Sequence, residues 1–390
     1  MNKFIYIPSL SAGAYATALK NNTIFFKDTP NAISSRYYSD DFPEEFRYKY
    51  FLVTAGYHYK NLNYVESHDL SNSFVFGDSG GYQICMGRVK FTQKLLEDTF
   101  RFLENNSTVA ANLDIPTKGK LNLSFEKCLE LSFPNFKYFA DNQSGKTKYL
   151  NVLHGLNPEQ IETWYNQVKG MPFHGWACGS VYRKVNWMFT LAFLLKNGEF
   201  HNQNEYLHIF GLSGVLDLLI CAQIQKSLNA IGSKVIITTD SSSPSLNALY
   251  GAYVQGVDYK NTSWRQMKLL KNQGIDYNID HPLPCIFNCP ICRSVTYKDF
   301  QKYSTLETQY MILHNTIMYA REAELIQKMV YAPNEILSTC LPKDVILLLD
   351  SIDRIFLDGD PIHTFKKFEQ LYRKFDGAEQ IKIQDNDNFF

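Results

Sequence analysis

Short apolar runs alternate with stretches of helical periodicity between Phe51 and Thr239. The runs are rich in β-branched and aromatic residues and end in glycine or a polar residue, a pattern typical of buried strands. After the second run, Leu96, Phe100 and Leu103 fall on one face of a helix. The pattern predicts strands at 51–55, 74–77, 109–114, 149–154, 175–179, 206–210 and 234–239, and helices at 93–104, 125–140, 157–168, 186–196 and 215–229.

This repeated strand–helix order predicts an α/β fold with a parallel sheet. Seven such strands, with an eighth expected in 274–280, favour a (β/α)8 TIM-like barrel over an open sheet. No dinucleotide fingerprint follows the first strand, which also argues against a doubly wound fold. We expect a catalytic barrel with an irregular N-terminal segment at 1–280, a metal-binding subdomain with a returning helix at 281–325, and a helical C-terminal extension at 326–390.

The two ends of the chain carry weaker signals. Residues 4–7 can form an opening strand that stops at Pro8, and 344–356 and 362–375 have the periodicity of helices. An apolar stripe in this tail, which includes Val345, Leu348 and Ile352, can pack on the barrel or form an interface. We expect it to pack on the barrel.

Composition limits the classes of protein to which the chain can belong. Of its 390 residues, 45% are apolar and 15% aromatic, enough for a substantial core. Lys and Arg number 39, as do Asp and Glu, so any nucleic-acid surface must be local. No apolar run spans a bilayer, and the N-terminus lacks the apolar core of a signal peptide. We therefore expect a cytoplasmic protein, in the host cytoplasm if a phage encodes it.

Polar residues and glycines gather at the predicted carboxyl ends of the strands. In a barrel these ends form the mouth, where functional groups lie. Three carboxylates in one mouth would repel one another, so that one holds a proton while another is ionised. That suits a nucleophile and a proton carrier; the alternative is that each aspartate caps the following helix. The residues concerned are Asp78, Asp114, His154, Gly179, Ser180, Gly211 and Asp240.

The segment 74–83, FVFGDSGGYQ, crowds several groups onto one strand end. Asp78 supplies a carboxylate, Ser79 a hydroxyl and Tyr82 an aromatic ring. The paired glycines allow positive φ and a close approach of the backbone to a ligand. Such a set can surround a small planar ligand, although a glycine-rich turn with a solvated aspartate is an equal alternative.

Three of the eight cysteines, Cys285, Cys289 and Cys292, cluster in the loop LPCIFNCPICR. Thiolates at this spacing converge on one metal ion. The fourth ligand is His314, in the apolar helical stretch 310–323, or the competing candidate His281. Three Cys and one His make a closed tetrahedral site for structural Zn²⁺, with no position open for catalysis. The alternative is a group of reduced cysteines beside a core-facing histidine.

The FGDSGGYQ segment, the later TTDS and the Cys cluster followed by His together resemble the tRNA-guanine transglycosylase superfamily. Its members are (β/α)8 barrels with a zinc subdomain, and they exchange guanine for a 7-deazaguanine base. The resemblance covers residues 50–325. It implies that Asp240 is the nucleophile and that Asp78 is the acid–base residue. It also implies a set of base-binding residues: Ser79, Tyr82, Asp114, His154, Gly179, Ser180, Phe210 and Gly211.

Within that set the resemblance assigns different tasks. Asp114 would hydrogen-bond the edge of the base together with Gly179 and Ser180. Tyr82 and Phe210 would stack on its two faces. His154 stands where the tRNA enzymes usually have Gln before Gly.

The departures from the tRNA enzymes favour the DNA-modifying, DpdA-like branch of the superfamily. Bacterial tRNA enzymes carry arginines after the nucleophile, whereas here SSSPSLNALYG follows Asp240 and no basic residue occurs before Lys260. Archaeal tRNA enzymes append an RNA-binding domain, whereas the tail here reads as helices. One spacer of the Cys cluster is also longer than in the CxCxxC of the tRNA enzymes.

We therefore expect a zinc-containing enzyme that inserts a 7-deazaguanine such as preQ0 into DNA, with a homo-oligomer or a helper protein left open. The alternatives are a tRNA enzyme, a non-catalytic barrel subunit and, less well supported, a zinc-dependent hydrolase. Several basic residues near strand ends can grip phosphates or be ordinary solvated charges. These are Arg88, Lys90, Lys118, Lys120, Arg183 and Lys184.

Overall fold

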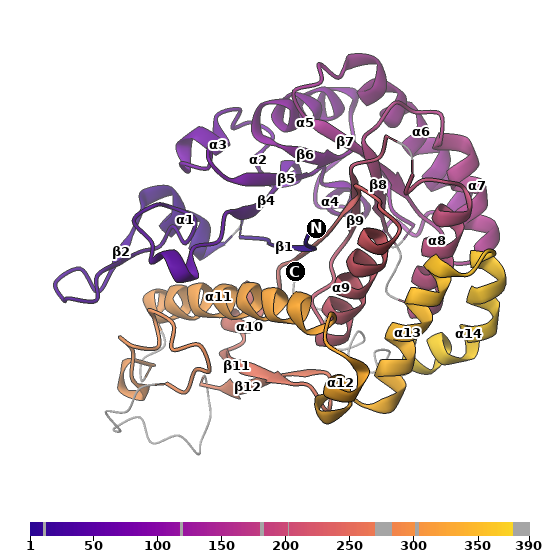
Figure 1. Ribbon diagram of the computed structural model, residues 1–390. Coiled ribbons are helices and arrows are strands. Elements are labelled where there is room, and N and C mark those ends of the chain that lie inside the picture. The colour runs from indigo at the N-terminus through magenta and orange to yellow at the C-terminus, as the bar shows by residue number, and fades with distance from the viewer. Residues whose placement is uncertain are drawn as a thin grey trace.

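The computed structural model describes residues 1–10, 13–117, 120–179, 183–201, 203–269, 283–300 and 304–376 (Figure 1). Its centre is a sheet of eight parallel strands in the order β1-β10-β9-β8-β7-β6-β5-β4. A parallel bridge between Ser9 and Leu52 joins the two outer strands, so the sheet curls into a nearly closed barrel. The strands are β1 (Ile5–Pro8), β4 (Tyr50–Thr54), β5 (Phe74–Asp78), β6 (Val109–Ala111), β7 (Lys148–Leu153), β8 (Gly175–Cys178), β9 (Tyr206–Ile209) and β10 (Ile236–Ser241).

Helices follow the strands and cover the outside of the barrel, which confirms the predicted TIM-like fold (Figure 1). Three of them begin at residues whose side chains accept a backbone N–H of the first turn, namely Thr92, Ser124 and Asn157. Such caps satisfy amides that have no partner inside the helix. The main barrel helices are α5 (Gln93–Asn106), α6 (Phe125–Asn142), α7 (Pro158–Val168), α8 (Lys184–Lys196) and α9 (Val215–Ala230).

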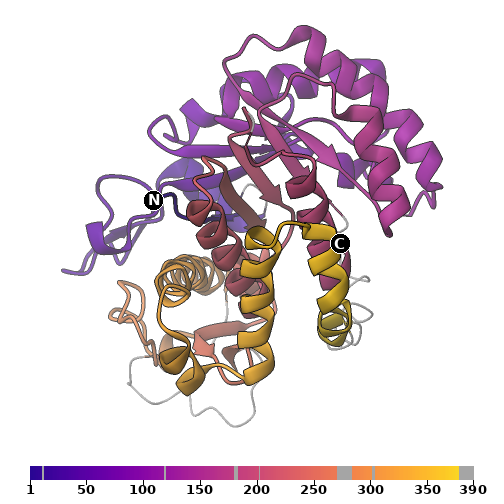
Figure 2. The ribbon, with the colours of Figure 1, turned by 45° about the vertical axis from the view of Figure 1, so that its right-hand side comes forward.

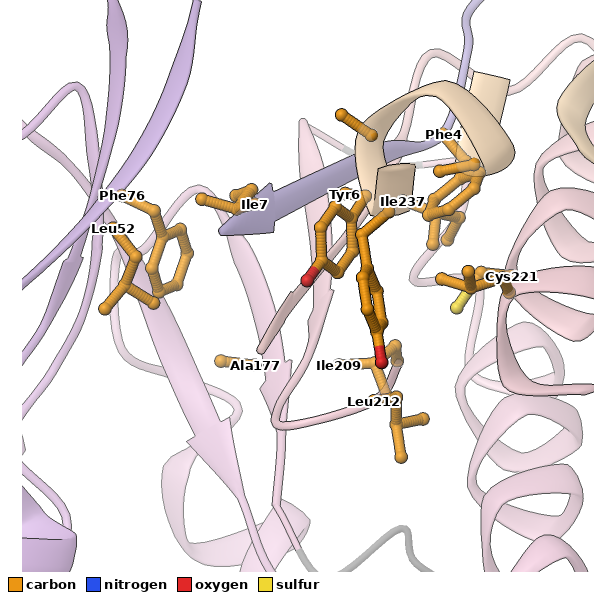
Figure 3. Packing of buried hydrophobic residues seen from close by; sticks show 14 of the residues in the cluster. Phe4, Tyr6, Ile7, Leu52, Phe76, Ala177, Ile209, Leu212, Cys221 and Ile237 are labelled. Carbon is orange, nitrogen blue, oxygen red and sulfur yellow. The ribbon is translucent and has the colours of Figure 1, made fainter. Parts of the chain in front are cut away.

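The eighth strand comes from the start of the chain. β1 pairs in parallel with β10, and Ile7 lies opposite Asp240. Figure 3 shows Ile7 directed toward Leu52 of β4 and Phe76 of β5, the strands that face β1 where the barrel closes. The range 274–280, where an eighth strand was expected, lies outside the described residues. The opening strand predicted at 4–7 therefore fills the place that the sequence analysis gave to a later segment.

Small elements occupy the N-terminal segment and the first strand ends. The hairpin of β2 (Ile24–Phe25) and β3 (Ile33–Ser34) packs against the later helix that carries Tyr310. The ring centroids of Phe25 and Phe26 lie 5.0 and 4.8 Å from that of Tyr310. The predicted irregular segment thus has a defined place in the fold. Its elements and the short helices after β4 and β5 are α1 (Ala14–Asn21), β2 (Ile24–Phe25), β3 (Ile33–Ser34), the 3-10 helix η1 (Glu44–Phe46), α2 (Ala55–His58), α3 (Tyr64–Ser67) and α4 (Gly81–Cys85).

After β10 the chain leaves the barrel and then returns to it. The sequence analysis did not predict the hairpin of β11 (Ala252–Asp258) and β12 (Ser263–Lys268), which lies on the side of α11 (Thr305–Met329) away from the barrel (Figure 1). On the way back, the side chain of Gln327 accepts the backbone N–H of Phe4 at 2.8 Å, which ties α11 to β1. The elements are α10 (Ser243–Leu249), β11 (Ala252–Asp258), β12 (Ser263–Lys268), the 3-10 helix η2 (Tyr297–Phe300) and α11 (Thr305–Met329).

The C-terminal helices α12 (Asn334–Cys340), α13 (Lys343–Leu357) and α14 (Pro361–Asp376) add a second layer. Figures 1 and 2 show α13 and α14 beside α8 and α9, and ring contacts such as Phe189–Phe365 at 5.5 Å join them. The expected packing of the tail on the barrel is confirmed. It explains why α8 and α9 are largely apolar and buried on nearly all sides, since both of their faces are covered. Within the described ranges no helix is long and apolar enough to cross a membrane.

Candidate functional site

The barrel mouth collects the polar residues that the sequence analysis assigned to strand ends. Because the strands are parallel, their carboxyl ends meet at one rim. Ser180 lies outside the described residues. The others are Asp78 at the end of β5, Asp114 after β6, His154 after β7, Gly179 after β8, Phe210 and Gly211 after β9, and Asp240 near the end of β10.

Asp78 is held in a setting that favours its protonated form. Burial, the largest cause, raises the pKa of its carboxyl to about 7, and repulsion from Asp240 and Asp114 acts in the same direction. The backbone N–H of Gly80, 3.1 Å from Oδ1, and the Thr54 hydroxyl oppose this rise. The three carboxylates are therefore close enough to influence one another, and Asp78 can release or take up a proton near neutral pH.

The paired glycines after Asp78 let neighbouring loops of the mouth touch. Gly80 has a φ of 88°, and a Cβ atom there would lie 2.6 Å from the Cα of Gly56. A Cβ atom on Gly81 would lie 2.2 Å from the carbonyl oxygen of Asp114. Any larger residue would force these loops apart. The two glycines thus bring Asp78 and Asp114 to the same side of the mouth.

Asp240 has two partners on one oxygen. Its Oδ1 accepts the backbone N–H of Gly211 at 2.8 Å and lies 3.3 Å from Nε2 of His208. His208 is fully buried, and the sequence analysis did not name it as a site residue. The signal that marks it is a single histidine in the otherwise apolar strand β9. Only the pairing of β9 with β10 shows that this histidine faces Asp240.

Asp114 and His154 form a buried pair, with Oδ2 and Nε2 2.6 Å apart. The imidazole is held edge-on by Trp164, at 5.0 Å between ring centroids. A Cβ atom on Gly179 would lie 2.2 Å from Cε1 of His154, so the ring packs directly on the backbone after β8. The structure thus brings together three of the residues predicted to bind a base, Asp114, His154 and Gly179.

The predicted stacking residues lie in different settings. Tyr82, on α4, is 46% exposed beside Asp78. Phe210 is partly buried, and its ring meets His208 edge-on at 4.7 Å. The hydroxyl of Ser79 donates to the carbonyl of Asn112 at 3.0 Å, which gives Ser79 a role in joining two mouth loops. Sandwiching of a base by the two rings, and contact of Ser79 with a ligand, stay predictions.

The predicted metal ligands converge on one point. The ligand atoms of Cys285, Cys289, Cys292 and His314 all lie within 4.8 Å of one another. Nδ1 of His314 is 3.3 and 3.2 Å from the sulfurs of Cys289 and Cys292. Nε2 lies 2.7 Å from the carbonyl of Val254, so it donates there and leaves Nδ1 free of a proton toward the sulfurs.

This donor set fits a tetrahedral metal ion such as zinc. The ring of Tyr253 stacks on that of His314 at 3.9 Å, and its hydroxyl donates to Sγ of Cys292 at 3.2 Å. Both Tyr253 and Val254 belong to the unpredicted β11–β12 hairpin. The competing candidate His281 lies outside the described residues.

The hairpin also connects the metal-ligand group to the mouth. The indole N–H of Trp264, on β12, donates to the carbonyl of Ser213 at 2.8 Å, in the loop after β9. The Ser213 hydroxyl is 2.9 Å from that of Ser241, the residue after Asp240. A short chain of contacts therefore runs from the hairpin to the end of β10.

The basic residues near the strand ends divide into two groups. Lys184 is buried, with Nζ 2.9 Å from Oδ1 of Asp217, so the idea that it grips phosphate is wrong. Its burial follows from the helical layer that covers α8. Arg88 is exposed and donates to the hydroxyl of Tyr57 at 3.2 Å. Lys118 lies outside the described residues, while Lys90, Lys120 and Arg183 are exposed.

Comparison with protein-family models found no match to this chain, and comparison with curated proteins found none either. The resemblance to the transglycosylases therefore stays a prediction from the sequence motifs. The function has to be inferred from the residues of the mouth and from their geometry.

Proposed function

We propose that this protein is a transglycosylase that exchanges guanine in DNA for a 7-deazaguanine base such as preQ0. One observation carries the proposal: Asp78 and Asp240 lie at one mouth and have different polar neighbours. The pKa of Asp78 is raised to about 7, whereas Asp240 has a backbone N–H and an imidazole beside the same oxygen. This division provides a proton carrier and a nucleophile.

The exchange takes place in two displacements. Asp240 attacks the sugar C1′ while the C1′–N9 bond breaks, as in retaining glycosidases, and a glycosyl-aspartate ester forms. The electron pair of the broken bond stays on guanine, which takes a proton from Asp78. The incoming base then gives its N9 proton to Asp78 and attacks C1′, which releases the Asp240 carboxylate. Proton and charge balance over the cycle, and Asp78 ends as it began.

Recognition of the base is assigned to the neighbouring strand ends. The Asp114–His154 pair combines an acceptor with an imidazole and can read the polar edge of a purine. Tyr82 and Phe210 offer aromatic faces, and stacking contributes about 1–3 kcal/mol per base. The target nucleotide has to leave its stack to reach a mouth of this kind.

The Cys3His group is assigned a structural role. A bound zinc ion would be held by Cys285, Cys289, Cys292 and His314 and would rigidify the loop beneath α11. Four protein ligands leave no coordination position for water or substrate, which weighs against a zinc-dependent hydrolase.

The choice of DNA over tRNA rests on the sequence around the mouth. No basic residue follows Asp240 before Lys260, and the tail is occupied by helices that pack on α8 and α9. Exposed Arg88, Lys120 and Arg183 near the strand ends supply cations for a phosphate backbone.

The test is base exchange by the purified full-length chain. Radiolabelled guanine is offered with duplex DNA, single-stranded DNA and bulk tRNA, with Asp240→Ala as the control. Label in DNA alone, lost in the variant, is the expected result. Label in tRNA alone would overturn the DNA assignment and keep the chemistry. Absence of label from every polymer would contradict the enzymatic proposal and favour a non-catalytic barrel subunit.

A further inference from the structure

A buried histidine lies directly beneath the proposed nucleophile. His208 has no exposed surface, and its two ring nitrogens both have polar neighbours. Nδ1 is 2.8 Å from the hydroxyl oxygen of Thr238, whereas Nε2 lies 3.3 Å from Oδ1 of Asp240, within the distance of an ion pair but outside the geometry of a hydrogen bond. The exchange reaction described above gives this histidine no proton to transfer.

The imidazole is fixed in place by aromatic rings. Phe76 stacks on it with centroids 3.8 Å apart and planes 19° apart, and Phe210 meets it edge-on at 4.7 Å. Phe76 lies on β5 and Phe210 directly follows β9, so the barrel holds both rings in place. With one face covered by Phe76 and Phe210 in edge contact, the ring keeps Nε2 toward β10.

The proton positions on His208 follow from its neighbours. A nucleophilic carboxylate only accepts hydrogen bonds, so an Nε2 that supports Asp240 in that role has to carry the ring proton. Nδ1 then accepts from the hydroxyl of Thr238. Burial lowers the pKa of His208, although the charge of Asp240 acts against this, and the neutral form is therefore the one present near neutral pH.

We infer that His208 is a positioning residue that selects which oxygen of Asp240 attacks the sugar. Together with the Gly211 N–H it engages Oδ1, so Oδ2 is left to face the substrate. The inference rests on the proposed function, because it assumes that Asp240 is the nucleophile. Two further groups act on the same carboxylate, Asp78 from β5 and Tyr6 from β1, and neither carries a positive charge. Of these side chains, His208 is the one whose nitrogen lies 3.3 Å from Oδ1.

The first experiment compares kcat and KM of base exchange for the wild type, His208→Gln and His208→Leu. Leucine removes the polar group beside Oδ1, so the carboxylate is no longer held in one orientation; we expect kcat to fall by about 10–100-fold with little change in KM. Glutamine retains an amide donor and should recover most of kcat. A merely structural role would lower kcat equally in both variants, and that outcome would overturn the inference.

A second measurement does not depend on activity or on the leucine variant. Nitrogen-15 NMR of histidine-labelled full-length protein reports which ring nitrogen carries the proton, and the signal that disappears in His208→Gln is that of His208. A proton on Nε2 is expected. Its absence from Nε2 would overturn the inference even if exchange activity is found. Inactivity of the wild type on all three polymers would instead reject the proposed function, whatever the NMR result.

Discussion

The barrel mouth and the Cys3His group use chemically reactive side chains in opposite ways. At the mouth, like charges lie near one another, and the pKa of Asp78 is raised to about 7. In the Cys3His group, each ligand faces the others, and the second nitrogen of His314 is satisfied by the Val254 carbonyl. The carboxylates of the mouth therefore repel one another, and this repulsion helps to raise the pKa of Asp78. A metal ion held by all four ligands of the Cys3His group would have no coordination position open.

The largest effect is expected for the nucleophile. Replacing Asp240 with Asn preserves its shape but removes the charge that attacks C1′, so base exchange should fall by about 1,000-fold or more while thermal stability changes little. Asp141→Asn, at an exposed position on α6, is the matched control and should retain full activity. Exchange at the wild-type rate in Asp240→Asn would show that the mouth does not use this carboxylate.

The next largest effect is expected at the Cys3His group, where loss of a ligand should lower the stability of the fold. Cys289→Ser should lower the bound zinc from about one ion per chain to a trace and lower the free energy of unfolding by about 3 kcal/mol or more, because metal binding is coupled to folding. Metal analysis and thermal unfolding measure both quantities. Cys340→Ser, on α12 and outside the ligand group, serves as the control. Full zinc content in Cys289→Ser would remove Cys289 from the ligand set.

A smaller effect concerns the raised pKa of Asp78. A carboxyl whose folded pKa of about 7 exceeds its unfolded value binds its proton more tightly in the native state, so stability is lost as pH rises from about 4 to about 7. Asp78→Asn removes that loss. Its stability relative to the wild type should therefore increase between pH 5 and pH 8, by roughly 1–3 kcal/mol after allowance for solvent. Equal pH slopes in urea unfolding of the two proteins would refute the raised pKa.

The smallest effect lies next to the metal ligands. Tyr253→Phe keeps the ring that stacks on His314 and removes the hydroxyl that donates to Sγ of Cys292. We expect a loss of about 0.5–1.5 kcal/mol and faster release of zinc to a chelator. Tyr250→Phe, at a residue that is 41% exposed on the same segment, should change neither. If both variants release zinc at the wild-type rate, the hydroxyl has no part in holding the ligands.

Local patterns were enough to predict much of this protein. The apolar runs and helical stripes located the seven strands and five main helices of the barrel, because buried strands and amphipathic helices impose their own periodicity. The order of the units indicated parallel strands, and so placed Asp78, Asp114 and Asp240 at one rim. The spacing of three cysteines likewise predicted a group of metal ligands, with His314 as one candidate for the fourth.

Contacts between distant segments were decided only by the tertiary structure. The pairing of β1 with β10 made the start of the chain the eighth strand, and the pairing of β9 with β10 set His208 against Asp240. The second helical layer buried Lys184 with Asp217, although a lysine near a strand end had suggested a free cation. Sequence periodicity records which face of an element is apolar, but not which element covers that face. The partners of these side chains therefore follow from packing and not from local pattern.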